Sequence, residues 1–202
     1  LDEDIDYFYL AGSNVEALES VTTERKRIWL LDYQTTPFSY GNWPGAWMRE
    51  RYAMADTQMF GKASITAFVK PNDLGNVDMG VQFSNGIAMS WRATDFYVKS
   101  GDSVAIKLVF GAPNIAVEDA YQIFLHLLDS EGRLIAGNDM GPFNNLRPTA
   151  SWFFGEKIDS PHGLFLPDDT VAGQYELHAG MYNQETGSRL LTSDGRDSIR
   201  LG

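Results

Sequence analysis

The chain contains no cysteine among its 202 residues, which excludes disulfide bonds and thiolate metal sites. Basic residues are scarce: 16 lysines and arginines accompany 27 aspartates and glutamates, for a net charge of −11. The sequence therefore predicts neither nucleic acid nor anionic lipid headgroups as partners, because both require a basic surface. No apolar run has the length of a membrane-spanning helix. Because the sequence begins at Leu1 rather than at a methionine, we expect it to be a segment of a longer protein.

The motifs of self-contained enzymes are also missing. The sequence has no Gly-x-Ser-x-Gly elbow, no phosphate-binding glycine loop and no His-Glu-x-x-His pattern. The turn at Ala11–Asn14 holds too little glycine for a dinucleotide fingerprint, so we expect no cofactor. These absences favour a segment without catalytic residues. A hydrolase remains an alternative, because two carboxylates far apart in the sequence can meet in the folded chain.

What the sequence does contain is a long series of strand patterns after residue 73. Gly173–Tyr182 alternates strictly between apolar and polar residues, and Tyr121–Leu128 is almost continuously apolar. The predicted inward, core-facing side chains of these two strands are Tyr175, Leu177, Ala179 and Met181, and Ile123, Leu125 and Leu127. Turn sequences follow both, at Asp129–Gly132 and Asn183–Gly187. Strands are expected near 77–83, 87–92, 95–98, 103–110, 121–128, 133–139, 164–166, 173–182, 188–192 and 197–201. This spacing predicts an antiparallel two-sheet β-sandwich, Ig-like or jelly-roll-like, over residues 73–202.

The first 72 residues alternate strand and helix patterns instead. Strands are expected at 6–10, 27–33 and 64–69. A capping box at Ser13–Glu16 predicts a helix to about Arg25, and a second helix should begin near Pro44. The apolar stripe of this second helix consists of Met48, Tyr52, Ala55 and Met59. The order predicts a small, mostly parallel α/β subdomain over residues 1–72, joined to the sandwich at Pro71–Gly75, and an α+β fold overall.

Two histidines are the weak candidates for a metal site. His126 and His178 lie on the outward parity of two expected strands, so they would approach each other if those strands were neighbours. Two imidazoles with a carboxylate can bind zinc. A third ligand at short spacing is missing, however, and the pattern favours histidines that form hydrogen bonds at a surface. The sequence therefore predicts no metal.

The irregular stretch Asp139–Trp152 is the candidate ligand site. Its hydrogen-bonding groups and flat ring lie on a loop that prolines stiffen, which suits a weak site for a sugar. The residues concerned are Asn144, Asn145, Arg147 and Trp152. A second interpretation is structural: the stretch crosses from one sheet to the other, and Trp152 fills the end of the sandwich core.

Gly180 interrupts the interior of an expected strand, where glycine is unfavourable. We expect an aromatic side chain, Trp152 or Phe165, to cover it. The outward face of the neighbouring pattern is half apolar at Phe124 and Leu128, so we expect this face to lie against the N-terminal subdomain.

An ordered series of short motifs runs through residues 74–202. It comprises Phe124–Asp129, Glu131–Arg133, Pro148–Thr149, Ser151–Trp152, Gly155–Glu156, Leu166–Pro167, Gly173–Tyr175, Gly180–Tyr182 and Thr186–Leu190. In this order the motifs resemble the extracytoplasmic β-sandwich at the C-terminus of bacterial multi-pass membrane glycosyltransferases. Those enzymes are similar to the protein mannosyltransferases and have a GT-C-type fold. Arg27–Tyr33 and Met59–Gly61 resemble the segment that follows their last membrane helices. The catalytic acids of that family lie in the membrane-embedded part, so the resemblance assigns no catalytic residue to this chain.

The resemblance implies a non-catalytic accessory domain of a membrane-bound glycosyltransferase that uses lipid-phosphate-sugar donors. Such a domain is extracytoplasmic, in the periplasm or at the cell surface, and is tethered by the rest of its protein. It would position an acceptor or stabilise the membrane domain. The implied partners are the membrane-embedded part of the same protein and a glycan or acceptor polypeptide. The alternative is a free-standing carbohydrate-binding or cell-surface module.

Overall fold

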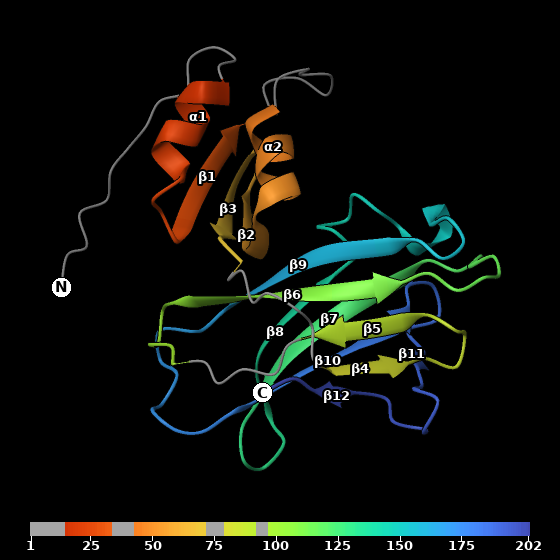
Figure 1. Cartoon of the computed structure of the whole chain (residues 1–202). Helices are drawn as coiled ribbons and strands as arrows, with labels where there is room; N and C mark the ends of the chain where they lie inside the picture. The colour runs from red at the N-terminus through yellow and green to blue at the C-terminus, as the bar shows by residue number, and fades with distance from the viewer. Residues whose placement is uncertain (1–14, 34–42, 72–78, 92–96) are drawn as a thin grey trace.

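The computed structural model describes residues 15–33, 43–71, 79–91 and 97–202. Over these residues the chain forms mostly antiparallel sheets with few helices, which is a β-rich α+β fold. An N-terminal unit lies against two larger sheets (Figure 1). The strand expected at 6–10 and the predicted domain boundary at 72–73 fall outside the described residues.

The strands in the described part of the chain form three sheets. The N-terminal unit consists of α1 (Val15–Thr22), α2 (Trp43–Arg51) and the sheet β1 (Arg27–Tyr33), β3 (Ala63–Val69), β2 (Ala53–Phe60). The four-stranded sheet has the order β4 (Met79–Gln82), β5 (Ala88–Trp91), β6 (Ser103–Gly111), β9 (Lys157–Phe165). The five-stranded sheet has the order β11 (Arg189–Leu190), β10 (Glu176–Asn183), β7 (Tyr121–Leu128), β8 (Leu134–Met140), with β12 (Ile199–Arg200) beside β10. A short 3-10 helix, η1 (Thr149–Ser151), precedes β9.

The N-terminal sheet is antiparallel, so the prediction of a mostly parallel sheet is wrong. The strand β3 pairs antiparallel with both β1 and β2. The reason lies in the second helix, which ends at Arg51 rather than continuing along the apolar stripe to Met59. The chain then enters β2 at once, and Gly61 with Lys62 turns β2 into β3. A turn this short joins antiparallel strands only, because parallel strands need a long crossover.

The N-terminal unit packs on the four-stranded sheet. On one face of its own sheet, α1 and α2 bury Leu18, Met48 and Phe68. On the other face, small side chains of β2 and β3 lie in one cluster with Ala105 of β6. The strand β9 approaches β2 so closely that a Cβ at Gly163 would lie 2.9 Å from the Cα of Ala55. Glycine is therefore required here by close backbone approach.

The two larger sheets share one hydrophobic core. Side chains from the four-stranded sheet meet side chains of the predicted inward parity on the five-stranded sheet. The former include Ile106, Leu108 and Phe110, and the latter include Ile123, Leu125, Leu177, Ala179 and Met181. The alternation along β7 and β10 therefore identified the buried faces correctly.

The strand β9 is a further departure from the expected strands, after β2, which was expected to continue a helix. Only residues 164–166 were expected to be extended, yet β9 begins at Lys157 and pairs with β6 along its whole length. Pro161 and Gly163 interrupt its sequence pattern, since both weaken strands. Pro161 is tolerated because β9 lies at the edge of its sheet, where a missing N–H group breaks no pairing.

An aromatic ring does cover Gly180, but it is Phe124 rather than Trp152 or Phe165. A Cβ at Gly180 would lie 2.6 Å from Cε1 of Phe124 and 3.0 Å from the carbonyl oxygen of Asp197. The guanidinium of Arg189 lies 4.5 Å from the centre of the same ring. Phe124 is thus covered within its own sheet, and the expectation that it faces the N-terminal unit is wrong.

Candidate functional site at the crossover between the two larger sheets

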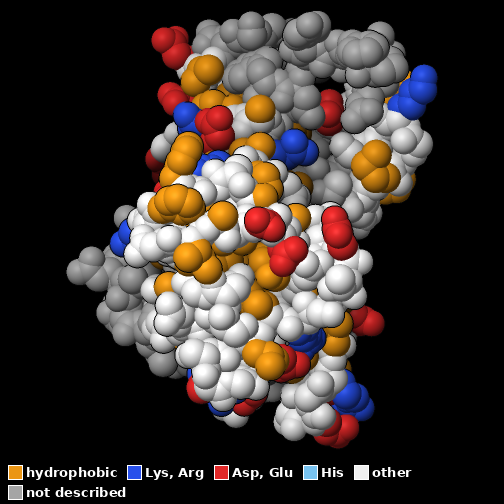
Figure 2. All heavy atoms as spheres, turned by 90° about the vertical axis from the view of Figure 1, so that its right-hand side faces the viewer, with side chains coloured by type: hydrophobic (Ala, Val, Ile, Leu, Met, Phe, Trp, Pro, Cys, Tyr) orange, Lys and Arg blue, Asp and Glu red, His pale blue; other side chains and the backbone are white. Residues whose placement is uncertain are grey.

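The candidate stretch crosses from β8 of the five-stranded sheet to β9 of the four-stranded sheet. The predicted stretch, Asp139–Trp152, begins within β8, and the crossover itself runs from Gly141 to Glu156 and includes η1, at the end of the sheets that lies on the right in Figure 1. Figure 2 looks onto this end and shows apolar side chains gathered across its middle. The structural interpretation from the sequence, a crossover between sheets, is confirmed.

The first turn of the crossover has an unusual backbone. Phe143, Asn144 and Asn145 have φ values of 53°, 54° and 66°, three consecutive residues in the left-handed region. Side chains with a Cβ are strained there, and Phe more so than Asn. Backbone amides close the turn, from Asn145 to the Gly141 oxygen at 3.1 Å and from Arg147 to the Pro142 oxygen at 3.2 Å. Such strain persists only where surrounding contacts hold the backbone in place.

Asn144 supplies those contacts. Its side chain is 1% exposed and reaches into the N-terminal unit. The Nδ2 atom donates to the carbonyl oxygens of Arg49 at 2.7 Å and Tyr52 at 2.6 Å, and Oδ1 accepts from the Met54 amide at 3.2 Å. The two carbonyls belong to the end of α2, where helices leave such groups without partners. Asn144 therefore joins the crossover to the N-terminal unit.

A second asparagine binds the same backbone. Nδ2 of Asn138, on β8, donates to the carbonyl oxygens of Met54 at 2.8 Å and Gly163 at 2.7 Å. Both backbone groups of Met54 are thus bound by side chains from beyond the N-terminal unit. The pairing of β2 with β3 shifts register between Met54 and Asp56, and this bulge exposes the backbone that the two asparagines bind. Asn138 was not among the residues predicted from the sequence, where its only signal is an amide within a strand pattern.

A buried hydroxyl and imidazole support the first turn from β9. The Phe143 amide donates to Oγ of Ser160 at 2.7 Å. Ser160 Oγ also forms a hydrogen bond with Nε2 of His162, at 2.9 Å. Burial lowers the pKa of His162 from its ordinary 6.5 to about 3, and the ring is therefore neutral.

The exposed part of the predicted site is small. Asn145 is exposed, but its Oδ1 accepts from the Gly141 amide at 2.7 Å. Nη2 of Arg147 forms an ion pair with Oε1 of Glu156 at 2.7 Å. The pKa of Glu156 lies below its ordinary value because its carboxylate accepts from the Phe153 amide and then from Arg147. Asn145 and Arg147 are the two predicted residues with surface available to a ligand.

Trp152 belongs to the core that the two larger sheets share. It is 9% exposed and its ring centre lies 5.8 Å from that of Phe110. Its Nε1 donates to the carbonyl oxygen of Arg147 at 3.0 Å. The ring therefore fills the end of the core, and its faces are used for packing.

The two metal candidates are direct cross-strand neighbours, His178 on β10 opposite His126 on β7. Each imidazole already has its own carboxylate. Nε2 of His126 lies 3.2 Å from Asp139, and Nε2 of His178 lies 3.0 Å from Glu176. Among the described residues, no group of three acidic or histidine side chains has a geometry that could hold a metal ion.

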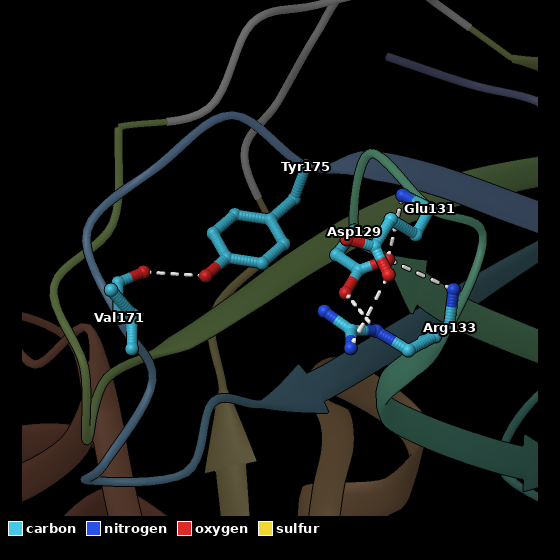
Figure 3. Close-up of polar contacts among 5 residues, drawn as sticks. All are labelled: Asp129, Glu131, Arg133, Val171 and Tyr175. Atoms are coloured by element: carbon cyan, nitrogen blue, oxygen red, sulfur yellow. Dashed lines mark hydrogen bonds and ion pairs between the residues drawn. The ribbon is translucent and has the colours of Figure 1, made fainter.

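The opposite end of β7 carries a second polar cluster, in the turn to β8 (Figure 3). Oδ1 of Asp129 accepts from the amides of Glu131 and Arg133, both at 2.9 Å, and Oδ2 accepts from Nε of Arg133 at 2.7 Å. These bonds lower the pKa of Asp129, with the Arg133 amide as the largest cause. Nearby, in the segment that precedes β10, the Tyr175 hydroxyl donates to the Val171 carbonyl oxygen (Figure 3). The carboxylate is satisfied by its own turn, which the sequence predicted.

Comparison with protein-family models, with curated proteins and with solved structures finds no match to this chain. Within the described ranges, no helix is both long and apolar enough to cross a bilayer.

Proposed function

We propose that this chain is a non-catalytic, extracytoplasmic accessory module of a membrane-bound glycosyltransferase. It positions the acceptor or stabilises the membrane-embedded part of the same protein. The ordered series of motifs that resembles such enzymes supports this proposal. The observation that carries it is the tight connection between the N-terminal unit and the larger sheets.

That connection has the properties of a positioning element. Asn138 and Asn144 bind the backbone of the N-terminal unit through four hydrogen bonds, three of them at the Asn144 side chain. A fifth, from Asn138 to the Gly163 carbonyl oxygen, joins β8 to β9. Gly163 adds direct backbone packing. A module that holds an acceptor at a fixed distance from a catalytic site needs such a rigid connection, because a flexible tether would not fix that distance.

The finer fold is part of the proposal. We infer that the two larger sheets form a β-sandwich of the Ig-like or jelly-roll-like kind. Their shared core and antiparallel pairing support this inference. In both kinds of sandwich, binding surfaces lie in loops at the sheet ends, and the crossover is one of these loops.

A free-standing carbohydrate-binding module is the second candidate function. The observation that favours it is the exposed pair of rings at Phe153 and Phe154, next to Arg147 on the same crossover. Aromatic rings with nearby hydrogen-bonding groups suit a shallow sugar site. This candidate predicts that the purified chain binds on a glycan array, and that Arg147→Ala removes the binding.

The test of the main proposal uses the full-length protein in isolated membranes. Its reading frame should encode membrane-spanning helices beside this segment; a frame with a signal peptide and no such helices contradicts the proposal. Asn144→Gly, which loosens the connection, should raise the KM for the acceptor and leave the KM for the lipid-linked donor unchanged. Asn145→Gly is the matched control, because it alters the same turn without touching the N-terminal unit. Equal transfer by both variants and the wild type would count against a positioning role.

A further inference from the structure

Two neighbouring phenylalanines point away from the molecule in the second turn of the crossover. Phe153 is 75% exposed and Phe154 is 68% exposed, directly after the buried Trp152. The turn is fixed from both sides. The Glu156 amide donates to the Phe153 carbonyl oxygen at 3.0 Å, and the Glu156 side chain accepts from the Phe153 amide at 3.0 Å. Gly155, at φ 69°, supplies the left-handed residue that the turn needs. The two rings are therefore held outward by a closed turn.

Further apolar side chains border this turn. The Ala112 amide donates to the Glu156 carbonyl oxygen at 2.8 Å, which brings the loop after β6 alongside the turn. Ile115 in that loop is exposed, as is Leu146 in the first turn of the crossover. We call Ile115, Leu146, Phe153 and Phe154 the apolar tip. It belongs to the end of the molecule seen in Figure 2.

The apolar tip is almost free of net charge in a strongly acidic chain. The crossover, residues 141–156, contains only Arg147 and Glu156 as charged side chains, and these form an ion pair. The exposed charged residues that follow the loop and the crossover are of both signs, namely Glu118, Asp119 and Lys157. The four side chains of the tip are themselves uncharged, so the tip offers no basic surface that selects anionic lipids.

We propose that the apolar tip inserts into the interface of an electrically neutral lipid bilayer, with Phe153 and Phe154 as the inserting side chains. The size of the tip favours lipid over a protein partner. The four side chains, on two turns and the neighbouring loop, offer on the order of a few hundred Å² of apolar surface. A stable protein interface buries about 1,200–2,000 Å² of surface. Fluid acyl chains can surround a protruding ring on all sides, and a rigid turn loses little entropy when it inserts.

This inference goes beyond the proposed function and does not depend on it. A free module with this tip would bind the same bilayer. In a membrane-tethered protein, insertion would fix how the module is oriented above the bilayer, which tethering at one point leaves open.

Flotation of the purified chain with phosphatidylcholine vesicles tests the inference. The wild type should float with the vesicles, and Phe153→Ser and Phe154→Ser should each lower the partition coefficient roughly tenfold or more, the range for removing one buried phenylalanine from an apolar phase. Val171→Ser is the matched control. Val171 is 75% exposed but follows β9, whereas the tip precedes it, so the two lie at opposite ends of that strand.

Two further conditions sharpen the test. Raising the salt concentration should not weaken binding, and replacing half of the lipid by phosphatidylglycerol should not strengthen it, because no basic surface is involved. Melting temperatures of all variants should equal that of the wild type, since both rings are exposed. The inference is overturned if the wild type stays in the unbound fraction. It is also overturned if the double variant, with both Phe153→Ser and Phe154→Ser, floats as well as the wild type. Concentration-dependent self-association that the double variant loses would instead assign the tip to contact between copies of the chain.

Vesicle binding separates this inference from the proposed function. A chain that floats with vesicles but whose reading frame encodes no membrane helices would support the apolar tip and contradict the glycosyltransferase proposal. If the chain does not float but the acceptor KM of the full-length protein depends on Asn144, the glycosyltransferase proposal is supported and the apolar tip is contradicted.

Discussion

The two turns of the crossover use their side chains in opposite ways. The first turn, at Phe143–Asn145, directs a polar side chain into the molecule, where the Asn144 amide binds backbone groups of the N-terminal unit. The second turn, at Phe153–Glu156, directs two apolar rings into solvent. Polarity alone would assign the asparagine to a ligand site and the phenylalanines to the core. The difference shows that a polar side chain is buried where backbone N–H and C=O groups need hydrogen-bond partners. It also shows that a turn closed by its own hydrogen bonds can hold aromatic rings in solvent.

The largest loss of stability is expected at Trp152, which lies between the two turns. Trp152→Ala should lower the free energy of unfolding by about 3–5 kcal/mol, because it deletes a buried ring that packs on Phe110. Phe153→Ala, one position later, should change it by less than about 0.5 kcal/mol. Urea unfolding followed by circular dichroism measures both. Equal losses from Trp152→Ala and Phe153→Ala would contradict a buried ring at Trp152 and an exposed ring at Phe153.

Asn144→Gly should have the next largest effect, about 2–4 kcal/mol, since it leaves two carbonyls and one amide of the N-terminal unit buried without partners. Glycine is chosen because it adopts a φ of 54° without strain, so the loss reports the side chain alone. Asn145→Gly, at a φ of 66°, is the matched control and should cost less than about 1 kcal/mol. Thermal and urea unfolding give both values. A control that is equally damaging would assign the effect to the turn rather than to the connection.

The ring of Phe124 covers the strand at Gly180, in contrast to the exposed rings of Phe153 and Phe154, and Gly180→Val tests this cover. The added side chain would collide with Phe124 and with the Asp197 carbonyl oxygen, so we expect a loss of about 1–3 kcal/mol. In the double variant with Phe124→Ala, part of this loss should be relieved, because one of the two obstacles is gone. Additive losses in the double-mutant cycle would mean that Phe124 does not cover Gly180.

The last effect develops only below pH 6.5 and concerns the support of the first turn. Because the pKa of His162 is about 3 in the folded chain and 6.5 when exposed, the unfolded chain binds the extra proton between these values. Stability from this group is complete above pH 6.5 and falls by about 1.4 kcal/mol per pH unit as the pH drops toward 3. The difference in unfolding free energy between the wild type and His162→Gln should follow that slope. A difference independent of pH would contradict a buried neutral ring.

Much of the five-stranded sheet was predictable because its signals are local. Alternation along Gly173–Tyr182 identified Leu177, Ala179 and Met181 as buried, and the Asp129 turn sequence formed the expected turn. The candidate site was less predictable. Its position at a sheet crossover followed from the pattern of breakers, but the burial of Asn144 depends on the Met54 backbone, 90 residues away in the chain.

The sequence by itself determined most of the extended segments after residue 73, the turns after β7 and β10 and the buried faces of those two strands, because these depend on neighbours two to four residues away. It did not determine β2, where a helix was expected to continue. The tertiary structure alone decided the direction of the strands in the N-terminal sheet, the extent of β9 and the use of the two crossover turns. Strand direction depends on how short a connection is, and β9 is extended through Pro161 because β6 offers it a partner. A polar group is buried, and a ring stays exposed, according to which distant backbone the fold brings beside it.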